Sequence, residues 1–137
     1  LSKLKKKYVV SPWVEDIVNK NKGKKYKRDK IINLYRISVK SLGFKKPTKL
    51  KKIYSKLKSK GFSLVPMEYA IYLRFIYDEQ PTGEWLRIAV PFSSMIDSDG
   101  VPHLPKLGKG LGKFFIETYW SYPDAIFHPH NDFIVKK

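Results

Sequence analysis

The sequence of 137 residues predicts an α+β fold, in which a lysine-rich three-helix region packs on a small antiparallel sheet built around a long hairpin. Three observations predict this class. Apolar residues recur at helical spacing in the first 62 residues, the apolar period changes to two after Pro66, and turns separate aromatic stretches in the remainder. We expect one compact domain with two parts, a basic helical region (residues 1–62) and an aromatic-rich antiparallel β region (residues 63–137).

The first helix is expected to follow a mobile basic arm formed by residues 1–10. Ser11 is a suitable N-cap, and Pro12 suits the first helical position because its missing N–H would be unpaired there anyway. The stripe that would face the core consists of Val14, Ile17 and Val18.

A second helix is expected from about residue 29 to residue 42, because apolar and charged residues again lie on opposite sides at helical spacing. Gly43 suits a left-handed C-terminal cap, on which Phe44 can fold back as the apolar partner. The preceding segment, residues 20–28, is interrupted by Gly23 and is expected to be solvated or bound to a ligand.

The third helix, expected over residues 48–60, shows the clearest helical pattern, with Thr48 as its N-cap. Its apolar stripe consists of Leu50, Ile53, Tyr54 and Leu57, and lysines occupy most of the other positions. Gly61 and Phe62 repeat the ending predicted at Gly43 and Phe44.

A long hairpin is expected after Pro66. Side chains alternate over residues 67–78, which favours a strand whose second face is also partly apolar. Residues 79–83 (EQPTG) would form the loop, and residues 85–90 the partner strand.

The rest of the chain is expected to contain more loops than strands. Residues 95–112 contain the runs DSDG, VPHLP and GKGLG, which are typical of turns. Residues 114–120 fit a strand or a short buried helix, and a last short strand is expected over residues 132–135. The carboxylates of Asp97 and Asp99 fit a turn better than an acid–base pair.

The net charge of +16 belongs entirely to the N-terminal part. Residues 1–60 carry 21 basic and 3 acidic side chains, whereas residues 61–137 carry 7 basic and 9 acidic side chains. A surface with this much positive charge repels itself, and its binding to a polyanion gains entropy because the lysines release the counterions condensed on the phosphates. We therefore expect RNA or DNA as the partner.

Lysine outnumbers arginine 24 to 4, which favours contact with the phosphate backbone over reading of bases, since bidentate recognition of a base edge needs the planar guanidinium. The expected function is that of a non-enzymatic structural component of a large nucleoprotein assembly, such as a ribosome or a virion, with residues 63–137 contacting neighbouring protein subunits. The candidate nucleic-acid-binding residues are Lys5, Lys6, Lys7, Lys24, Lys25, Lys27, Arg28, Arg36, Lys40, Lys45, Lys46, Lys49, Lys51, Lys52 and Lys56.

Two alternative functions remain open. His128 and His130 lie two positions apart and could share a metal ion with Asp132, as in a metal-dependent nuclease, although Pro129 between them suits a loop. The order helix, helix, turn, helix, hairpin is also that of a winged-helix DNA-binding regulator, with residues 48–60 in a groove and residues 79–83 as the wing. The acidic residue in that loop speaks against a wing that touches phosphate.

Several other classes are not expected. The chain has no cysteine, which removes disulfides, Cys-based zinc sites and thiol catalysis. The glycines of GKGLG lack the spacing of a phosphate loop, no cofactor is expected, and an anionic membrane surface is only a minor competitor for the lysines. Trp85 and Trp120 could stack on unpaired bases, although core packing is the commoner role. We expect a protein that is neither secreted nor transmembrane, located inside a cell or a virus particle.

Overall fold

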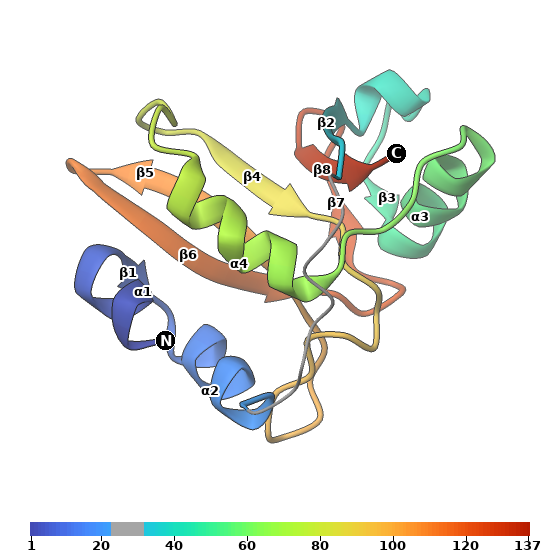
Figure 1. The fold of residues 1–137 in the computed structure, drawn as a ribbon. Coiled ribbons are helices and arrows are strands. Elements are labelled where there is room, and N and C mark those ends of the chain that lie inside the picture. The colour runs from blue at the N-terminus through green and yellow to red at the C-terminus, as the bar shows by residue number, and fades with distance from the viewer. Residues whose placement is uncertain (23–31) are drawn as a thin grey trace.

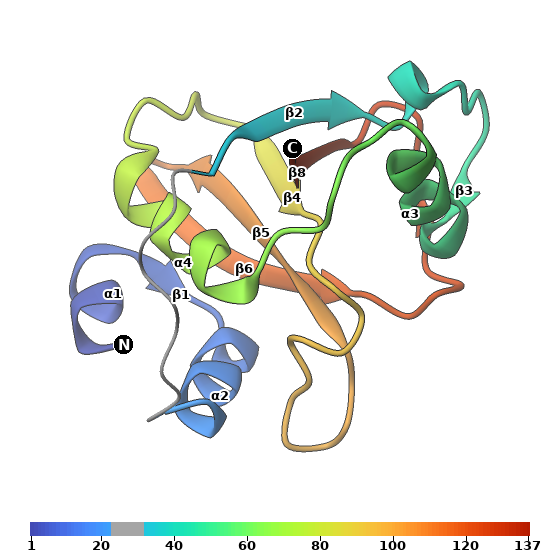
Figure 2. The ribbon, with the colours of Figure 1, turned by 45° about the vertical axis from the view of Figure 1, so that its right-hand side comes forward.

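The computed structural model describes residues 1–22 and 32–137, and it is an α+β structure with a mixed sheet (Figures 1 and 2). Its helices are α1 (Ser2–Lys7), α2 (Pro12–Lys20), α3 (Leu50–Ser59), α4 (Met67–Ile76) and the 3-10 helix η1 (Lys40–Leu42). Its strands are β1 (Val9–Val10), β2 (Leu34–Ser38), β3 (Thr48–Lys49), β4 (Trp85–Ile88), β5 (His103–Gly110), β6 (Lys113–Trp120), β7 (Ile126–Phe127) and β8 (Asp132–Lys136).

Six strands form the main sheet in the order β1-β6-β5-β4-β8-β2, and β3 pairs with β7 in a second, small sheet. The expected antiparallel sheet is therefore wrong in one respect: β1 runs parallel to β6 and β4 runs parallel to β8. The long hairpin of the sheet is β5–β6, whose eight residue pairs extend from His103 and Trp120 to Gly110 and Lys113.

The basic N-terminal half does not form one three-helix region. Figures 1 and 2 place α1 and α2 at one end of the sheet and α3 at the other end, while α4 crosses the sheet between them. A single apolar core joins the two ends, because Ile17 of α2, Leu57 of α3 and Leu107 of the sheet all belong to the same cluster of buried side chains. The lysines of α1 and those of α3 consequently face different surroundings.

Residues 67–78 form helix α4 and its end, so the strand expected there is wrong. The buried side chains, Met67, Ala70 and Arg74, recur at helical spacing, and the other sides carry apolar residues that are partly buried or, at Tyr72 and Ile76, exposed. Arg74 lies inside because its guanidinium donates hydrogen bonds to Gln80 Oε1 (2.7 Å) and to backbone carbonyls of the sheet. This buried charge removes the apolar residue that would have revealed the helical period.

The second expected helix, over residues 29–42, is also wrong for the residues that the structure describes. Residues 34–38 form the edge strand β2, which pairs antiparallel with β8 at the far end of the chain. Arg36 ties this pairing together, because its guanidinium bonds Asp132 of β8 at 2.6 and 3.0 Å. Only η1 remains helical, and it ends at Gly43, whose φ of 98° confirms the expected left-handed cap.

Residues 1–10, expected to be a mobile arm, fold as α1 and β1. Leu4 and Tyr8 are buried, and the Tyr8 ring contacts Phe75 of α4 edge-on at 5.4 Å between centroids. Val9 and Val10 pair with β6. The apolar residues between the lysines therefore suffice to dock this segment on the sheet.

Several other predictions are confirmed. Helix α2 begins after Ser11, whose hydroxyl accepts a hydrogen bond from the N–H of Val14. The expected apolar stripe of α3 is buried, Gly61 has a φ of 86°, and β4 and β8 are strands. Residues 103–110, expected to be loop, form strand β5. The strand tolerates Pro105 because this residue lies just beyond those that pair with β4, and it tolerates Gly108 because the ring of Trp85 packs on that position.

Candidate nucleic-acid interface and an aromatic pocket

Nine lysines lie exposed on η1, the loop after it, β3 and α3, and we call them the α3 lysine surface. The apolar stripe of α3 packs inward, so the intervening lysines of the helix point to solvent. No acidic residue occurs between Lys30 and Met67. The α3 lysine surface consists of Lys40, Lys45, Lys46, Lys49, Lys51, Lys52, Lys56, Lys58 and Lys60.

The N-terminus of α3 is satisfied by a distant segment instead of by Thr48, which is buried in β3 and donates to the carbonyl of Lys46. The N–H groups of Leu50 and Lys51 donate to the carbonyls of Ala125 and Pro123. A side-chain cap at Thr48 is therefore wrong, and residues 123–125 take its place.

Asp124 provides the only carboxylate that pairs with the α3 lysine surface within residues 1–22 and 32–137. Its Oδ1 lies 3.2 Å from Lys51 Nζ and 3.5 Å from Lys49 Nζ. The hydrogen bond from Lys51, together with the charge of Lys49, lowers the pKa of Asp124. The other seven lysines of this surface have no ion pair with the described part of the chain, so their charge faces solvent.

The remaining basic candidates fall into three groups. Lys5, Lys6 and Lys7 lie exposed on α1, where Lys5 pairs with Glu15 at 2.8 Å. Arg36 is held by two carboxylates, Glu84 at 2.7 Å and Asp132 at 2.6 Å, which leave little of its charge for a ligand. The candidates that lie outside the described residues are Lys24, Lys25, Lys27 and Arg28.

The candidate metal residues gather only in part. His130 and Asp132 line a shallow hollow of about 340 Å³ together with Arg36, and the rings of His128 and His130 stack at 5.6 Å. The carboxylate of Asp132 is engaged by Arg36, and the described residues contain no group of three side chains suited to hold a metal ion. The element order of a winged helix is not found either, since α4 occupies the position of its first hairpin strand.

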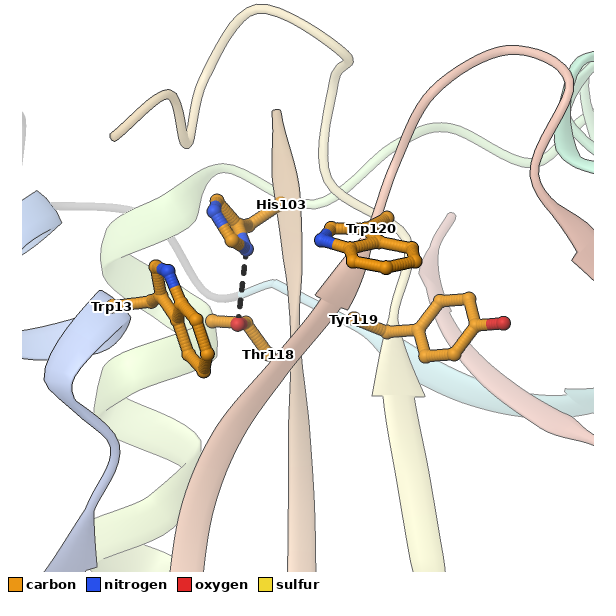
Figure 3. A pocket seen from close by; sticks show the side chains of 5 residues that line it. All are labelled: Trp13, His103, Thr118, Tyr119 and Trp120. Carbon is orange, nitrogen blue, oxygen red and sulfur yellow. Dashed lines mark hydrogen bonds between the residues drawn. The ribbon is translucent and has the colours of Figure 1, made fainter. Parts of the chain in front are cut away.

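A second hollow, of about 220 Å³, lies where the N-terminal turn of α2 meets the C-terminal end of β6, and we call it the aromatic pocket (Figure 3). Trp13 and Trp120 flank it, and their side chains are 53% and 60% exposed. His103 and Thr118 lie between the two indoles, and Tyr119 also lines the hollow, although its ring points away from Trp13. Tryptophan is usually mostly buried, so two exposed indoles around one hollow form an accessible apolar surface.

The polar groups of the aromatic pocket form one chain of hydrogen bonds. His103 is 2% exposed, its Nε2 lies 2.8 Å from Asp97 Oδ2, and its Nδ1 lies 3.0 Å from Thr118 Oγ1. The bond with His103, followed by the N–H of Val101, lowers the pKa of Asp97 below its ordinary value of 3.8. Asp97 is therefore a carboxylate that accepts from Nε2–H.

Because both nitrogens of the buried imidazole are already bonded, His103 orients the Thr118 hydroxyl and offers no open base to a substrate. The Thr118 hydroxyl can both donate and accept, and the bond with His103 Nδ1 uses only one of these positions. The pocket can thus accept or donate one hydrogen bond between two aromatic side chains.

Of the residues that line this pocket, the sequence singles out only Trp120, as a residue that could stack on an unpaired base, because the pocket is assembled from three distant segments. The alternation of Thr118 and Trp120 on one face of β6 is visible in the sequence, but the register that places His103 beside them is not. The expected turn at Asp97 is confirmed, since its Oδ1 accepts from the N–H groups of Asp99 and Val101.

Comparison with known proteins adds no relative: family models, curated proteins and solved structures were all searched, and none matches this chain. Within residues 1–22 and 32–137, no helix combines the length and the apolarity needed to cross a bilayer.

Proposed function

We propose that this protein binds the phosphate backbone of nucleic acid through the α3 lysine surface. The observation that carries the proposal is the seven exposed lysines of this surface that no carboxylate of the described residues pairs with. Each lysine that neutralises a phosphate releases a condensed counterion, so a dense lysine surface gains affinity for a polyanion.

The chemistry of the surface favours backbone contact without sequence reading. All nine of its basic residues are lysines, which are mobile point charges, and Arg36, the candidate arginine that the structure describes, is paired with two carboxylates. Phosphate contacts position a protein on nucleic acid but carry no sequence information. The role that fits such binding is that of a structural component of a nucleoprotein assembly, inside a cell or a virus particle, with the less basic half of the chain facing neighbouring subunits.

The test is a salt titration of binding to labelled duplex DNA, duplex RNA and single strands of mixed sequence. The logarithm of the association constant should fall linearly with the logarithm of the salt concentration, with a slope of about −0.9 for each contacted phosphate of B-DNA. Competitor nucleic acids of different sequence should displace the labelled strand equally well. An affinity that does not change with salt concentration would overturn the proposal. An affinity for one sequence that is ~10³-fold or more higher than that for random duplex would overturn it as well.

A further inference from the structure

The aromatic pocket lies close to the α3 lysine surface along a short piece of chain. Trp120 lines the pocket, and Asp124, four residues later, pairs with Lys49 and Lys51. An extended chain spans at most about 3.6 Å per residue, so the two residues lie within about 14 Å of each other. Figures 1 and 2 both show the chain passing from the end of β6 to β7, beside α3.

The segment between Trp120 and Asp124 also offers contacts to a ligand that reaches from the pocket to the α3 lysine surface. Tyr122, two residues after Trp120 and two before Asp124, is 46% exposed, so this connection carries a further exposed aromatic side chain. Phosphates of a stacked strand follow each other about every 3.4 Å along its axis, and those of an extended strand lie further apart, so at most roughly four nucleotides cover the same distance. A strand with a base at Trp120 can therefore place its following phosphates against Lys49 and Lys51.

The size and lining of the aromatic pocket define what it can hold. At about 220 Å³ it is smaller than the ~300–1,000 Å³ pockets that take drug-sized molecules, so it suits a single ring system. Its walls are the faces and edges of aromatic rings, and Thr118 supplies one adaptable polar group. A nucleobase has a π-face for stacking and an edge with both donors and acceptors.

We infer that the aromatic pocket binds one unpaired base of a single-stranded nucleic acid whose phosphates lie on the α3 lysine surface. This inference rests on the proposed function, and it adds that single strands are preferred to duplexes. Bases inside a duplex are stacked on each other and cannot enter the pocket, whereas an unpaired base stacks on Trp13 or Trp120 without reference to sequence.

The experiment compares the wild-type protein with Trp120→Ala in binding to labelled single strands and duplexes at one salt concentration. Loss of a stacking partner should weaken single-strand binding by roughly tenfold and leave duplex binding unchanged. Trp120→Phe should retain most of the affinity because it keeps an aromatic ring. Tyr72→Ala is the matched control, since Tyr72 is 60% exposed on α4 and does not line the pocket.

A second measurement separates this inference from the proposed function. Free adenosine and free uridine should quench the tryptophan fluorescence of the wild type, and less so that of Trp13→Ala and Trp120→Ala, with ribose as the control. If nucleosides quench the fluorescence but polynucleotide binding does not depend on salt, the pocket still binds bases and the proposed function is wrong. Salt-dependent binding with equal losses of single-strand and duplex affinity in Trp120→Ala, or with no loss, would overturn the inference alone.

Discussion

Gly108 lies on strand β5, in the middle of the main sheet, and the indole ring of Trp85 occupies the space that a side chain at this position would fill. Trp85 is its partner in the register of β4 and β5, and a Cβ at Gly108 would lie 2.4 Å from Trp85 Cε3. Lys106 Nζ lies 4.9 Å from the centre of the same ring. The indole therefore depends on glycine beneath it.

Gly108→Ala should destabilise the protein by about 1–3 kcal/mol, because the new methyl group forces Trp85 out of its position. Gly110→Ala is the control, since a Cβ there meets Phe115 at an ordinary 3.9 Å, and it should change the stability by less than about 0.5 kcal/mol. Urea unfolding followed by tryptophan fluorescence measures both. Equal stabilities of the two variants would show that Trp85 does not pack on this glycine.

Asp97 gives the stability of the fold a dependence on acid. Its pKa in the folded protein is lower than in the unfolded chain, so the unfolded state binds more protons as the pH falls. Its stabilising contribution is present above the unfolded pKa of about 4 and is lost as the pH falls through the lower pKa of the folded state.

The Asp97→Asn variant should be less stable than the wild type at neutral pH, and its free energy of unfolding should fall less steeply below about pH 4. Denaturant unfolding across this range gives both slopes, with Asp99→Asn, a change at an exposed neighbouring carboxylate, as the control. If the free energy of unfolding falls with pH in parallel for Asp97→Asn and the wild type, Asp97 is not the source of the acid dependence.

At the scale of elements, the N-terminus of α3 is where the proposed ligand and the protein's own acidic group compete. Asp124 pairs with Lys49 and Lys51 there, and residues 123–125 also accept the first N–H groups of the helix. A phosphate that approaches this end of α3 must displace the carboxylate or share the two lysines with it.

Asp124→Asn should therefore tighten nucleic-acid binding by roughly two- to fivefold at low salt, the range expected when an exposed ion pair is released. Asp78→Asn removes the same charge from the loop after α4 and should have a smaller effect. Fluorescence anisotropy with a labelled single strand distinguishes them. If both variants gain equally, net charge alone sets the affinity and Asp124 has no local role.

Elements with a strong local pattern could be predicted from the sequence, and elements that depend on distant partners could not. The stripe of α3 and the cap of α2 require only neighbouring residues, and both predictions are confirmed. The sequence predicts a helix where strand β2 lies because its partner strand, β8, lies about a hundred residues later and leaves no local signal. The alternation predicts a strand where α4 lies because apolar residues occupy most positions of the helix and one of its two fully buried positions carries Arg74.

The candidate sites follow the same division. Charge is a property of composition, so the density of lysine over residues 40–60 could be predicted, whereas the separation of α1 from α3 depends on the sheet between them. The pairing of Arg36 with Glu84 and Asp132 and the meeting of Trp13, His103 and Trp120 also depend on strand register, which no local pattern encodes.

At the scale of the whole molecule, the positive charge is distributed over two ends of one sheet. The α3 lysine surface occupies one end, while Lys6 and Lys7 lie near Gly112 and Lys113 of the β5–β6 turn at the other end (Figures 1 and 2). Long-range attraction of a polyanion depends on the total charge, but displacement of counterions depends on the lysines that actually touch phosphates. The two contributions can be separated by removing the same number of positive charges either from the α3 lysine surface or from the other end of the sheet.

The most direct measurement is the salt slope of single-strand binding for the wild type, for Lys52→Gln/Lys56→Gln on α3 and for Lys109→Gln/Lys113→Gln on the β5–β6 hairpin. Each α3 lysine that contacts a phosphate should reduce the slope by about 0.7, so the first pair should lower it by about 1.4. The hairpin pair, which removes an equal charge, should leave the slope close to that of the wild type. Equal slopes for the two double variants, or an unchanged slope for Lys52→Gln/Lys56→Gln, would contradict an interface on α3.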